Sequence, residues 1–211
     1  MPDGTLPTVK KGRKFAQVLE GARKVFMADG FEGASVDDIA KTAQVSKATL
    51  YSYFPDKRLL FMEVARAECQ RQAEGAIATI DMDGPVRDVL HDIALQMVHF
   101  LTSDFGLRIF RICVGESDRF PELGQEFYES GPMMVRSRIV DYLTDATLRG
   151  DLHIADVPLA ADQFAELCKA DLFPRIVFNM DRTFSQAEID RVVDGAVAMF
   201  MACYGTPPAK T

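Results

Sequence analysis

The sequence is poor in the residues that hold metals and cofactors. Its 211 residues include only four cysteines and three histidines, and tryptophan is absent. The cysteines, Cys69, Cys113, Cys168 and Cys203, are far apart without a CxxC pair, and the histidines add no zinc-ligand spacing. We therefore expect no metal and no cofactor. The thiols are expected to be reduced and buried, with a redox-sensing cysteine as the alternative.

Long hydrophobic runs are missing as well, and the longest is far shorter than a membrane span. Residues 1–12 are polar and contain proline, unlike a signal peptide. We therefore expect a cytoplasmic protein with no membrane contact. There is also no glycine-rich phosphate loop, GxSxG elbow, HExxH pair or Cys/His pair at metal spacing. The sequence predicts that the protein is not an enzyme.

The chain does contain apolar residues at helical spacing. Hydrophobic residues make up 48 % of it, enough for a sizeable core. Their spacing predicts helices along the whole chain and no strand, so the expected fold class is all-α. The helices are expected at residues 13–28, 35–43, 46–54, 56–80, 86–102, 104–116, 121–149, 158–173 and 185–204, with a bend or break at Gly131-Pro132.

The segment from Ser46 to Phe54 is the most informative of these helices. Ser46 is a good N-cap, and Pro55 ends the helix. Leu50 and Phe54 form an apolar stripe, which leaves the other, mostly polar side chains on the remaining faces. A purely structural helix would rarely carry so many cation, hydroxyl and phenol groups. Lys47 lies in the first turn, where the helix dipole disfavours a cation unless a polyanion such as DNA is nearby.

A second short helix precedes this one, and together they form a helix-turn-helix pattern. Ser35 is its expected N-cap, with Asp38 at the capping-box position. Residues 44–46 make a three-residue turn into the next helix. The buried face of the preceding helix consists of Val36, Ile39, Ala40 and Ala43.

These residues resemble the DNA-binding domain of the TetR/AcrR family of transcriptional regulators. The resemblance covers residues 14–61 and is dense and collinear. Residues 111–123 resemble the AefR-like branch of C-terminal domains in that family. The motifs that carry the first resemblance are Phe26-(x)3-Gly30-Phe31, Ser35-Val36-(x)2-Ile39-Ala40 and Val45-Ser46-Lys47-Ala48-Thr49-Leu50-Tyr51-Ser52-Tyr53-Phe54-(x)2-Lys57-(x)2-Leu60.

One position departs from the family pattern. The turn between the two short helices usually carries a glycine, where this chain has Gln44. If the turn keeps its usual shape, Gln44 must adopt a positive φ, which is uncommon for a residue with a Cβ atom. The alternatives are modest strain or a slightly different angle between the two helices.

The resemblance implies that the helix at residues 46–54 binds DNA. The residue types suit this role, because lysine can donate to guanine, alanine and tyrosine can pack on a thymine methyl, and hydroxyls suit phosphate oxygens. For Tyr53, packing against the long helix is an equal alternative. The implied contacts are Lys47, Ala48 and Tyr51 to base edges and Ser35, Thr49, Tyr53 and Lys57 to phosphates, with Ser46 completing the set as the helix cap.

The distribution of charge supports a division of the chain into parts. Residues 1–66 hold 11 Lys/Arg and 8 Asp/Glu, a net +3, whereas residues 67–211 hold 13 and 23, a net −10. We predict a mobile tail at residues 1–12, a DNA-binding domain at 13–55 and a larger helical domain at 56–211, which begins with a connecting helix at 56–80. The basic residues Lys10, Lys11, Arg13 and Lys14 either reach a phosphate or the minor groove or belong to a solvated tail.

The larger domain is expected to hold a hydrophobic ligand. Phenylalanine and methionine suit an adaptable pocket, although for any one of them ordinary core packing is the simpler explanation. Arg108 and Arg111 are candidates to bind an acidic group of the ligand, and Arg108 alternatively pairs with Asp104. His99 is interpreted as a buried histidine rather than a ligand contact. The candidate lining residues are Met97, Phe100, Phe105, Arg108, Ile109, Phe110, Cys113, Phe127, Met133, Met134, Phe164, Leu167 and Phe178.

The last helix, at residues 185–204, has two apolar faces. The second face is a stripe of Gly195, Ala198, Met199 and Ala202. Two apolar faces need two partners, and we expect one of them to lie in a second subunit; burial in one monomeric core is the alternative. The family resemblance implies a four-helix bundle made by the last two helices of each subunit.

The sequence therefore predicts a homodimeric, DNA-binding regulator of transcription. The resemblance implies a repressor that binds a roughly palindromic operator and is released by a small, largely hydrophobic effector. The alternative is a helical small-molecule binding protein that no longer binds DNA, for which Gln44 is the only support in the sequence. A helical enzyme comes third.

Overall fold

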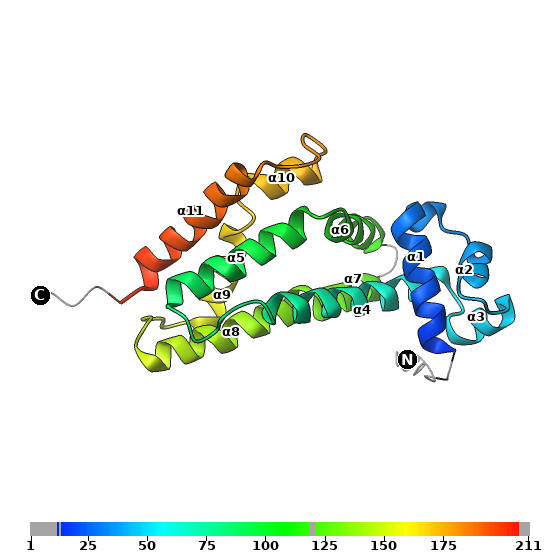
Figure 1. Cartoon of the computed structure of the whole chain (residues 1–211), viewed down its shortest axis with the longest axis horizontal. Helices are drawn as coiled ribbons and strands as arrows, with labels where there is room; N and C mark the ends of the chain where they lie inside the picture. Colours follow the sequence, from blue (N-terminus) through cyan, green and yellow to red (C-terminus); the bar gives the residue numbers. More distant parts are fainter. Residues whose placement is uncertain (1–11, 13, 119–120, 207–211) are drawn as a thin grey trace, which may run out of the picture. The chain divides into compact units, whose positions relative to one another are not determined.

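The computed structural model describes Gly12, residues 14–118 and residues 121–206. Within these ranges the chain is helical and contains no strand, and one isolated antiparallel bridge joins Leu152 and Gly205. The expected all-α fold class is confirmed. The chain divides into two compact units, one up to Glu68 and one from Cys69 onwards, and the division falls inside the long helix α4 (Lys57–Ile77) (Figure 1).

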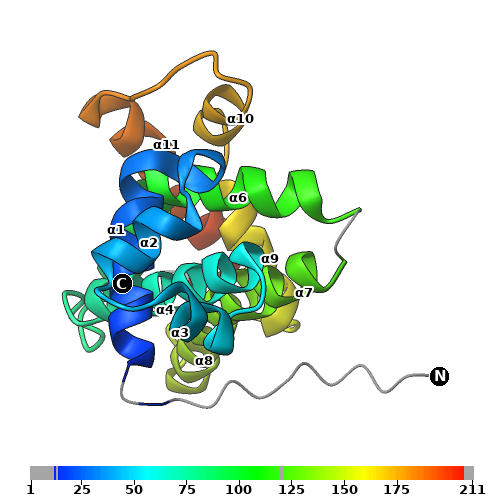
Figure 2. The same cartoon turned by 90° about the vertical axis from the view of Figure 1, so that its right-hand side faces the viewer.

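The first unit contains α1 (Phe15–Gly33), α2 (Val36–Thr42), α3 (Lys47–Tyr53) and the first part of α4. Figure 2 shows the three N-terminal helices in one compact group. Aromatic rings close their core: Phe15 stacks on Phe54 with centroids 5.4 Å apart, and Phe61 meets Phe26 edge-on at 5.2 Å. These contacts hold one face of α3 inside the unit. The other buried side chains of this core include Val18, Ala22, Ile39, Leu50 and Leu60.

Two glycines shape α1. Gly30 has a φ of 72°, outside the helical region, and a further turn carries α1 to Gly33, beyond the expected end near residue 28. Gly21 lies directly against Ala43, because a Cβ atom on residue 21 would be only 2.5 Å from the Ala43 Cβ. Only glycine fits at this crossing, so the middle of α1 and the end of α2 approach each other closely.

The second unit contains the rest of α4 and seven further helices within the described residues. α5 (Val86–Thr102) packs on α11 (Gln186–Tyr204), and α8 (Pro132–Arg149) packs on α9 (Val157–Leu167), as Figure 1 shows. The unit is completed by α6 (Asp104–Glu116), α7 (Pro121–Ser130) and α10 (Leu172–Val177). Its core includes Leu90, Val98, Leu143, Phe164, Val193 and Phe200.

The helix predicted at residues 121–149 is broken at the expected point, between α7 and α8. The single helix predicted at residues 158–173 is wrong, because α9 ends at Leu167 and α10 begins only at Leu172. Asp171, just before α10, has a left-handed φ of 64°, a conformation that a continuous right-handed helix excludes.

Two arginines fix the short helix α10 in place. Arg111 of α6 donates to the carbonyl oxygens of Ile176, at 2.8 Å, and Val177, at 2.9 Å, where a cation is favoured by the C-terminal end of the helix. Arg175 of α10 donates to the carboxylates of Asp181, at 2.8 Å, and Glu188, at 3.0 Å. α10 is thereby tied both to α6 and to the start of α11.

The expectation of buried cysteines holds for Cys69, Cys113 and Cys168, whereas Cys203 on α11 is exposed. Burial raises the pKa of the Cys113 and Cys168 thiols to about 12, so both stay protonated at neutral pH. Among the helices in the described ranges, none is long and apolar enough to cross a membrane.

Candidate nucleic-acid interface

Serine caps start both short helices of the helix-turn-helix. The Ser35 hydroxyl accepts from the backbone N–H of Asp38 at 3.0 Å, and the Ser46 hydroxyl accepts from that of Thr49 at 3.1 Å. Both expected N-caps are confirmed. The Asp38 carboxylate accepts a hydrogen bond from the Ser35 hydroxyl. In a complete capping box it would accept from the backbone N–H of Ser35 instead.

The outer face of α3 carries the side chains expected to contact base edges. Lys47 and Ala48 are exposed, and the Tyr51 side chain is 48 % exposed. Behind them, Leu50 and Phe54 are only 1 % and 2 % exposed. The predicted stripe therefore anchors α3 from inside and leaves an ammonium group, a methyl group and a phenol on its surface.

Lys47 has a partner that sequence patterns did not indicate. Its ammonium group forms an ion pair with the carboxylate of Asp37 in the first turn of α2. The two side chains are 59 % and 63 % exposed, respectively, so water surrounds the pair. Asp37 thus offsets the unfavourable position of a cation at the start of α3.

Gln44 has the positive φ that the usual turn shape requires, at 54°. The turn from α2 to α3 therefore has the conformation that a glycine would adopt more readily. Because the side chain of Gln44 is exposed, its amide lies on the surface next to the start of α3.

Tyr53 and Lys57 both have contacts within the protein. The Tyr53 ring is half-buried and lies edge-on to Phe15 of α1, with centroids 5.8 Å apart. The Lys57 ammonium group donates to the carbonyl oxygens of Phe31, at 2.8 Å, and Ala34, at 3.1 Å. Two of its three hydrogens are therefore used at the end of α1, which leaves one for a phosphate.

The candidate ligand residues lie in several environments. The guanidinium group of Arg111, a candidate to bind an acidic ligand group, instead donates to backbone carbonyl oxygens at the end of α10. Arg108 is exposed and has no ion-pair partner, Asp104 included, among the described residues, and His99 is exposed instead of buried. Phe178 is 77 % exposed. Phe105, Ile109, Cys113 and Phe164 are buried, and Met97, Phe100, Phe110, Phe127, Met133, Met134 and Leu167 are half-buried.

Aromatic pairs connect part of this set. Phe100 at the end of α5 meets Phe105 of α6, with centroids 6.4 Å apart, and Phe110 of α6 meets Phe173 of α10 at 5.2 Å. The structure therefore brings the apolar side chains of α6 against α5 and α10. Phe164 belongs to the core around α5, α8 and α11, where it contacts Phe200 at 5.1 Å.

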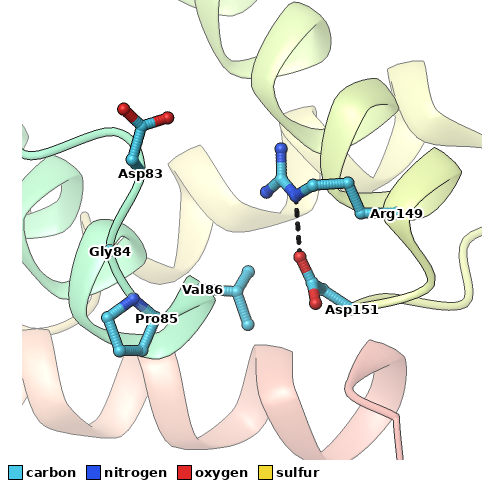
Figure 3. Close-up of a pocket in the computed structure, with 6 residues that line it drawn as sticks. All are labelled: Asp83, Gly84, Pro85, Val86, Arg149 and Asp151. Carbon is cyan, nitrogen blue, oxygen red and sulfur yellow. Dashed lines mark hydrogen bonds and ion pairs between the residues drawn. The ribbon is translucent and has the colours of Figure 1, made fainter.

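A pocket of different character lies at the start of α5 (Figure 3). On one side Arg149, the last residue of α8, donates to Asp151 at 2.9 Å, and on the other lies the loop of residues 83–86. None of the candidate ligand residues lines this pocket. Its charged side chains, two aspartates and one paired arginine, do not suit a hydrophobic ligand.

The second stripe of α11 is on the surface of the chain. Gly195, Ala198 and Ala202 are exposed, and Met199 is 63 % exposed. A Cβ atom on Gly195 would meet nothing within 4 Å. The opposite stripe, from Ile189 to Phe200, is buried in the core as expected. No group of histidine, cysteine or carboxylate side chains in the described ranges is arranged to hold a metal ion.

Two family models match the chain. The model described as bacterial regulatory proteins of the tetR family matches residues 18–64, and that of the AefR-like transcriptional repressor C-terminal domain matches residues 88–206. Among named relatives, the chain is similar to the HTH-type transcriptional repressor AcnR of Corynebacterium diphtheriae, with 36 % identity over 74 residues. This match covers 35 % of the chain and 38 % of that repressor.

Solved structures match over nearly the whole chain. A TetR-family regulator from Mesorhizobium loti is 27 % identical and has a TM-score of 0.83, with 92 % of this chain and 98 % of that one covered. The flavonoid-responsive regulator FrrA is 33 % identical, with a TM-score of 0.72 and coverage of 94 % and 100 %. With the outward face of α3 and two family models that together span most of its helices, the chain belongs to the TetR family of bacterial transcriptional regulators.

Proposed function

We propose that the chain is a homodimeric repressor of transcription, which binds an approximately palindromic DNA operator in the cytoplasm and is released by a small hydrophobic effector. The observation that carries this proposal is the outer face of α3. Lys47, Ala48 and Tyr51 are exposed there, while Leu50 and Phe54 anchor the helix from behind.

The chemistry of this face suits the major groove. The Lys47 ammonium group can donate to guanine O6 and N7, and Ala48 and Tyr51 can pack on thymine methyl groups. The hydroxyls of Thr49 and Tyr53 and the remaining hydrogen of Lys57 are the proposed phosphate contacts, with Ser46 as the cap of α3. The Ser35 hydroxyl joins them only if a phosphate replaces the Asp38 carboxylate to which it donates. In a dimer, two copies of α3 would enter successive major grooves about 34 Å apart.

The exposed stripe of α11 is the proposed dimer contact. Gly195, Ala198 and Ala202 allow another helix to approach closely, and Met199 adds apolar area that water now covers. A stripe of this kind on a helix whose other side is already buried fits the family bundle, in which α11 and the preceding segment 158–173, here α9 and α10, would meet their counterparts in a second subunit.

The effector is proposed to bind among the apolar side chains of α5, α6 and α10, where Phe100, Phe105, Ile109 and Phe110 lie. The similarity to FrrA, a flavonoid-responsive regulator, makes flavonoids the first probes to use. Effector and operator would weaken each other reciprocally, by about 1–3 kcal/mol.

The decisive experiment measures binding of the full chain to duplexes that it selects from a random-sequence pool. We expect salt-dependent binding, followed by fluorescence anisotropy, and a loss of at least about tenfold for Lys47→Ala and for Tyr51→Ala. Lys24→Ala and Tyr128→Ala are matched controls, because both side chains are exposed elsewhere on the chain. Equal binding by all variants, or no selected duplex, contradicts the proposal.

The alternative, a helical binding protein without DNA binding, rested on Gln44. The positive φ of Gln44 gives the turn the conformation of a glycine, and this supports the DNA-binding proposal. Tight flavonoid binding with no salt-dependent DNA binding would reverse that preference.

A further inference from the structure

The ion pair between Asp37 and Lys47 joins the first turns of the two helices that meet the DNA in the proposed function. Both side chains are more than half exposed, so neither is fixed there by packing. In this pair, Asp37 binds the ammonium group that is expected to contact a base edge.

Helix dipoles explain why this arrangement is stable in the free protein. A carboxylate is favoured in the first turn of α2, whereas a cation is disfavoured in the first turn of α3. The partial positive charge at the start of α3 disfavours the Lys47 ammonium group, and the carboxylate of Asp37 offsets this effect. Without DNA, Lys47 is thus better placed against Asp37 than alone in water.

Other polar groups on this surface are also occupied within the protein. The Ser35 hydroxyl donates to Asp38, and the hydroxyls of Ser46 and Thr49 share a hydrogen bond of 2.9 Å. A phosphate that approaches the start of α2 therefore meets two carboxylates, Asp37 and Asp38, and a lysine whose charge is already balanced. Non-specific attraction to the DNA backbone is weakened at this point.

For the Lys47 ammonium group, a guanine edge is a more favourable partner than a phosphate near the start of α2. Its O6 and N7 atoms are two acceptors at fixed positions in the major groove, and they lie away from the phosphates that Asp37 repels. An exposed ion pair contributes little free energy, so this exchange of partners costs little once the base is correctly placed.

We propose that Asp37 is a specificity-determining residue of the DNA interface. It keeps Lys47 on the protein when the chain meets arbitrary DNA, and it yields Lys47 to a base edge with suitable acceptors. This inference rests on the proposed function, since it assumes that α3 enters the major groove.

The test compares Asp37→Asn with the wild-type chain on two duplexes, one selected by the wild type from a random pool and a scrambled duplex of the same composition. Asp29→Asn is the matched control, because it removes one exposed aspartate from α1 in the same unit. Circular dichroism melting checks that each variant is folded. Affinities are measured by anisotropy over a series of salt concentrations.

We expect Asp37→Asn to tighten binding to the scrambled duplex by about twofold to fivefold at low salt, the range typical of exposed ion pairs. Binding to the selected duplex should change less, so the ratio of the two affinities falls. The gain should shrink at high salt because the charges are screened. In a Lys47→Ala background, Asp37→Asn should leave this ratio unchanged.

Three results would overturn the inference. A ratio that is unchanged in the wild-type background would make Asp37 a repulsive charge only. A tenfold loss on the selected duplex would mean that Asp37 itself contacts a base. An equal effect of Asp29→Asn would mean that net charge alone matters. If the wild-type chain binds no duplex, the proposed function fails as well; if it binds and only the ratio is insensitive, the proposed function stands.

Discussion

Lys57 contacts Phe31 twice: its ammonium group donates to the Phe31 carbonyl oxygen at 2.8 Å and lies 4.5 Å from the centre of the Phe31 ring. The same ammonium group also donates to the carbonyl oxygen of Ala34. Together these contacts tie the start of α4 to the irregular end of α1, where a cation is favoured by the helix dipole.

We therefore expect Lys57→Met to lower the free energy of unfolding by about 1–2 kcal/mol, because methionine keeps the apolar stem and loses the hydrogen bonds. Urea unfolding measures this loss. Lys24→Met, at an exposed lysine of α1, is the control.

The same variant separates the structural role of Lys57 from a phosphate contact. If Lys57 also neutralises a phosphate, Lys57→Met should reduce the slope of log affinity against log salt by about one. An unchanged slope, together with lower stability, would restrict Lys57 to its structural role. An unchanged free energy of unfolding would contradict the importance of the carbonyl contacts.

Gln44 provides a test of backbone strain. A residue with a Cβ atom in the left-handed region costs about 1–2 kcal/mol, whereas glycine there costs about 0.5–1 kcal/mol in chain entropy. We expect Gln44→Gly to leave the chain between equally stable and about 1 kcal/mol more stable, as measured by chemical unfolding. Gln44→Val should be less stable than the wild type, because a β-branched residue fits this φ poorly. The opposite order would show that the turn is not strained.

The exposed stripe of α11 predicts the effect of a charge at its centre. Met199→Glu should raise the dissociation constant of the dimer by about 100-fold, because a charge would be buried in an apolar contact. Sedimentation velocity over a range of concentrations measures this change. Met82→Glu, at a methionine that is 37 % exposed in the loop before α5, is the control and should remain dimeric. A dimer of wild-type strength with Met199→Glu would exclude this stripe as the contact.

The junction of α10 and α11 should depend on pH. Hydrogen bonds from the Ser185 backbone N–H and hydroxyl, followed by one from Arg175, hold the pKa of the Glu188 carboxyl below its ordinary value of 4.5. Because this pKa is lower in the folded than in the unfolded state, the stabilisation is complete above 4.5 and is lost as the pH falls through the folded value.

Glu188→Gln should therefore be less stable than the wild type near neutral pH, and the gap in melting temperature should narrow in acid. Glu129→Gln, at an exposed glutamate of α7, is the matched control. A gap that stays constant from neutral to acid pH would contradict this account of the carboxylate.

Local signals in the sequence were sufficient for much of the fold and for the outer face of α3. Ser35 and Ser46 start their helices as serine caps usually do, and Leu50 and Phe54 are buried as their spacing predicts. The positive φ of Gln44 is the conformation expected if the turn keeps the shape usual in the family, and the sequence left a different angle between the two helices open as an alternative. In each of these cases the cause lies within a few residues of its effect.

The break between α9 and α10 could not be predicted in this way. Phe164, Cys168 and Leu172 are all buried and keep the helical spacing across the break, so the pattern alone favours one helix. The end of α10 is bound by Arg111, whose carbonyl partners are 65 and 66 residues away in the chain. A single sequence contains no local signal for such a contact.

The same limit applies to the candidate site. The partners of Lys57 are 23 and 26 residues away, and the pairing of Lys47 with Asp37 depends on how the two helices cross. The sequence shows that Asp37 lies at the start of a helix, but the usual preference for acidic residues in a first turn explains this position as well as a pairing with Lys47 does. Geometry, and not residue type, distinguishes these roles.

The close contact of Gly21 with Ala43 has a consequence for how such a regulator changes its target. The crossing leaves no room for a side chain at residue 21, and it fixes the end of α2, just before the turn into α3, against α1. The side chains at positions 47, 48 and 51 are free of that constraint because they face water. If α3 binds DNA as proposed, new operator preferences can therefore arise by substitution on the outer surface, while the backbone that positions those side chains stays the same.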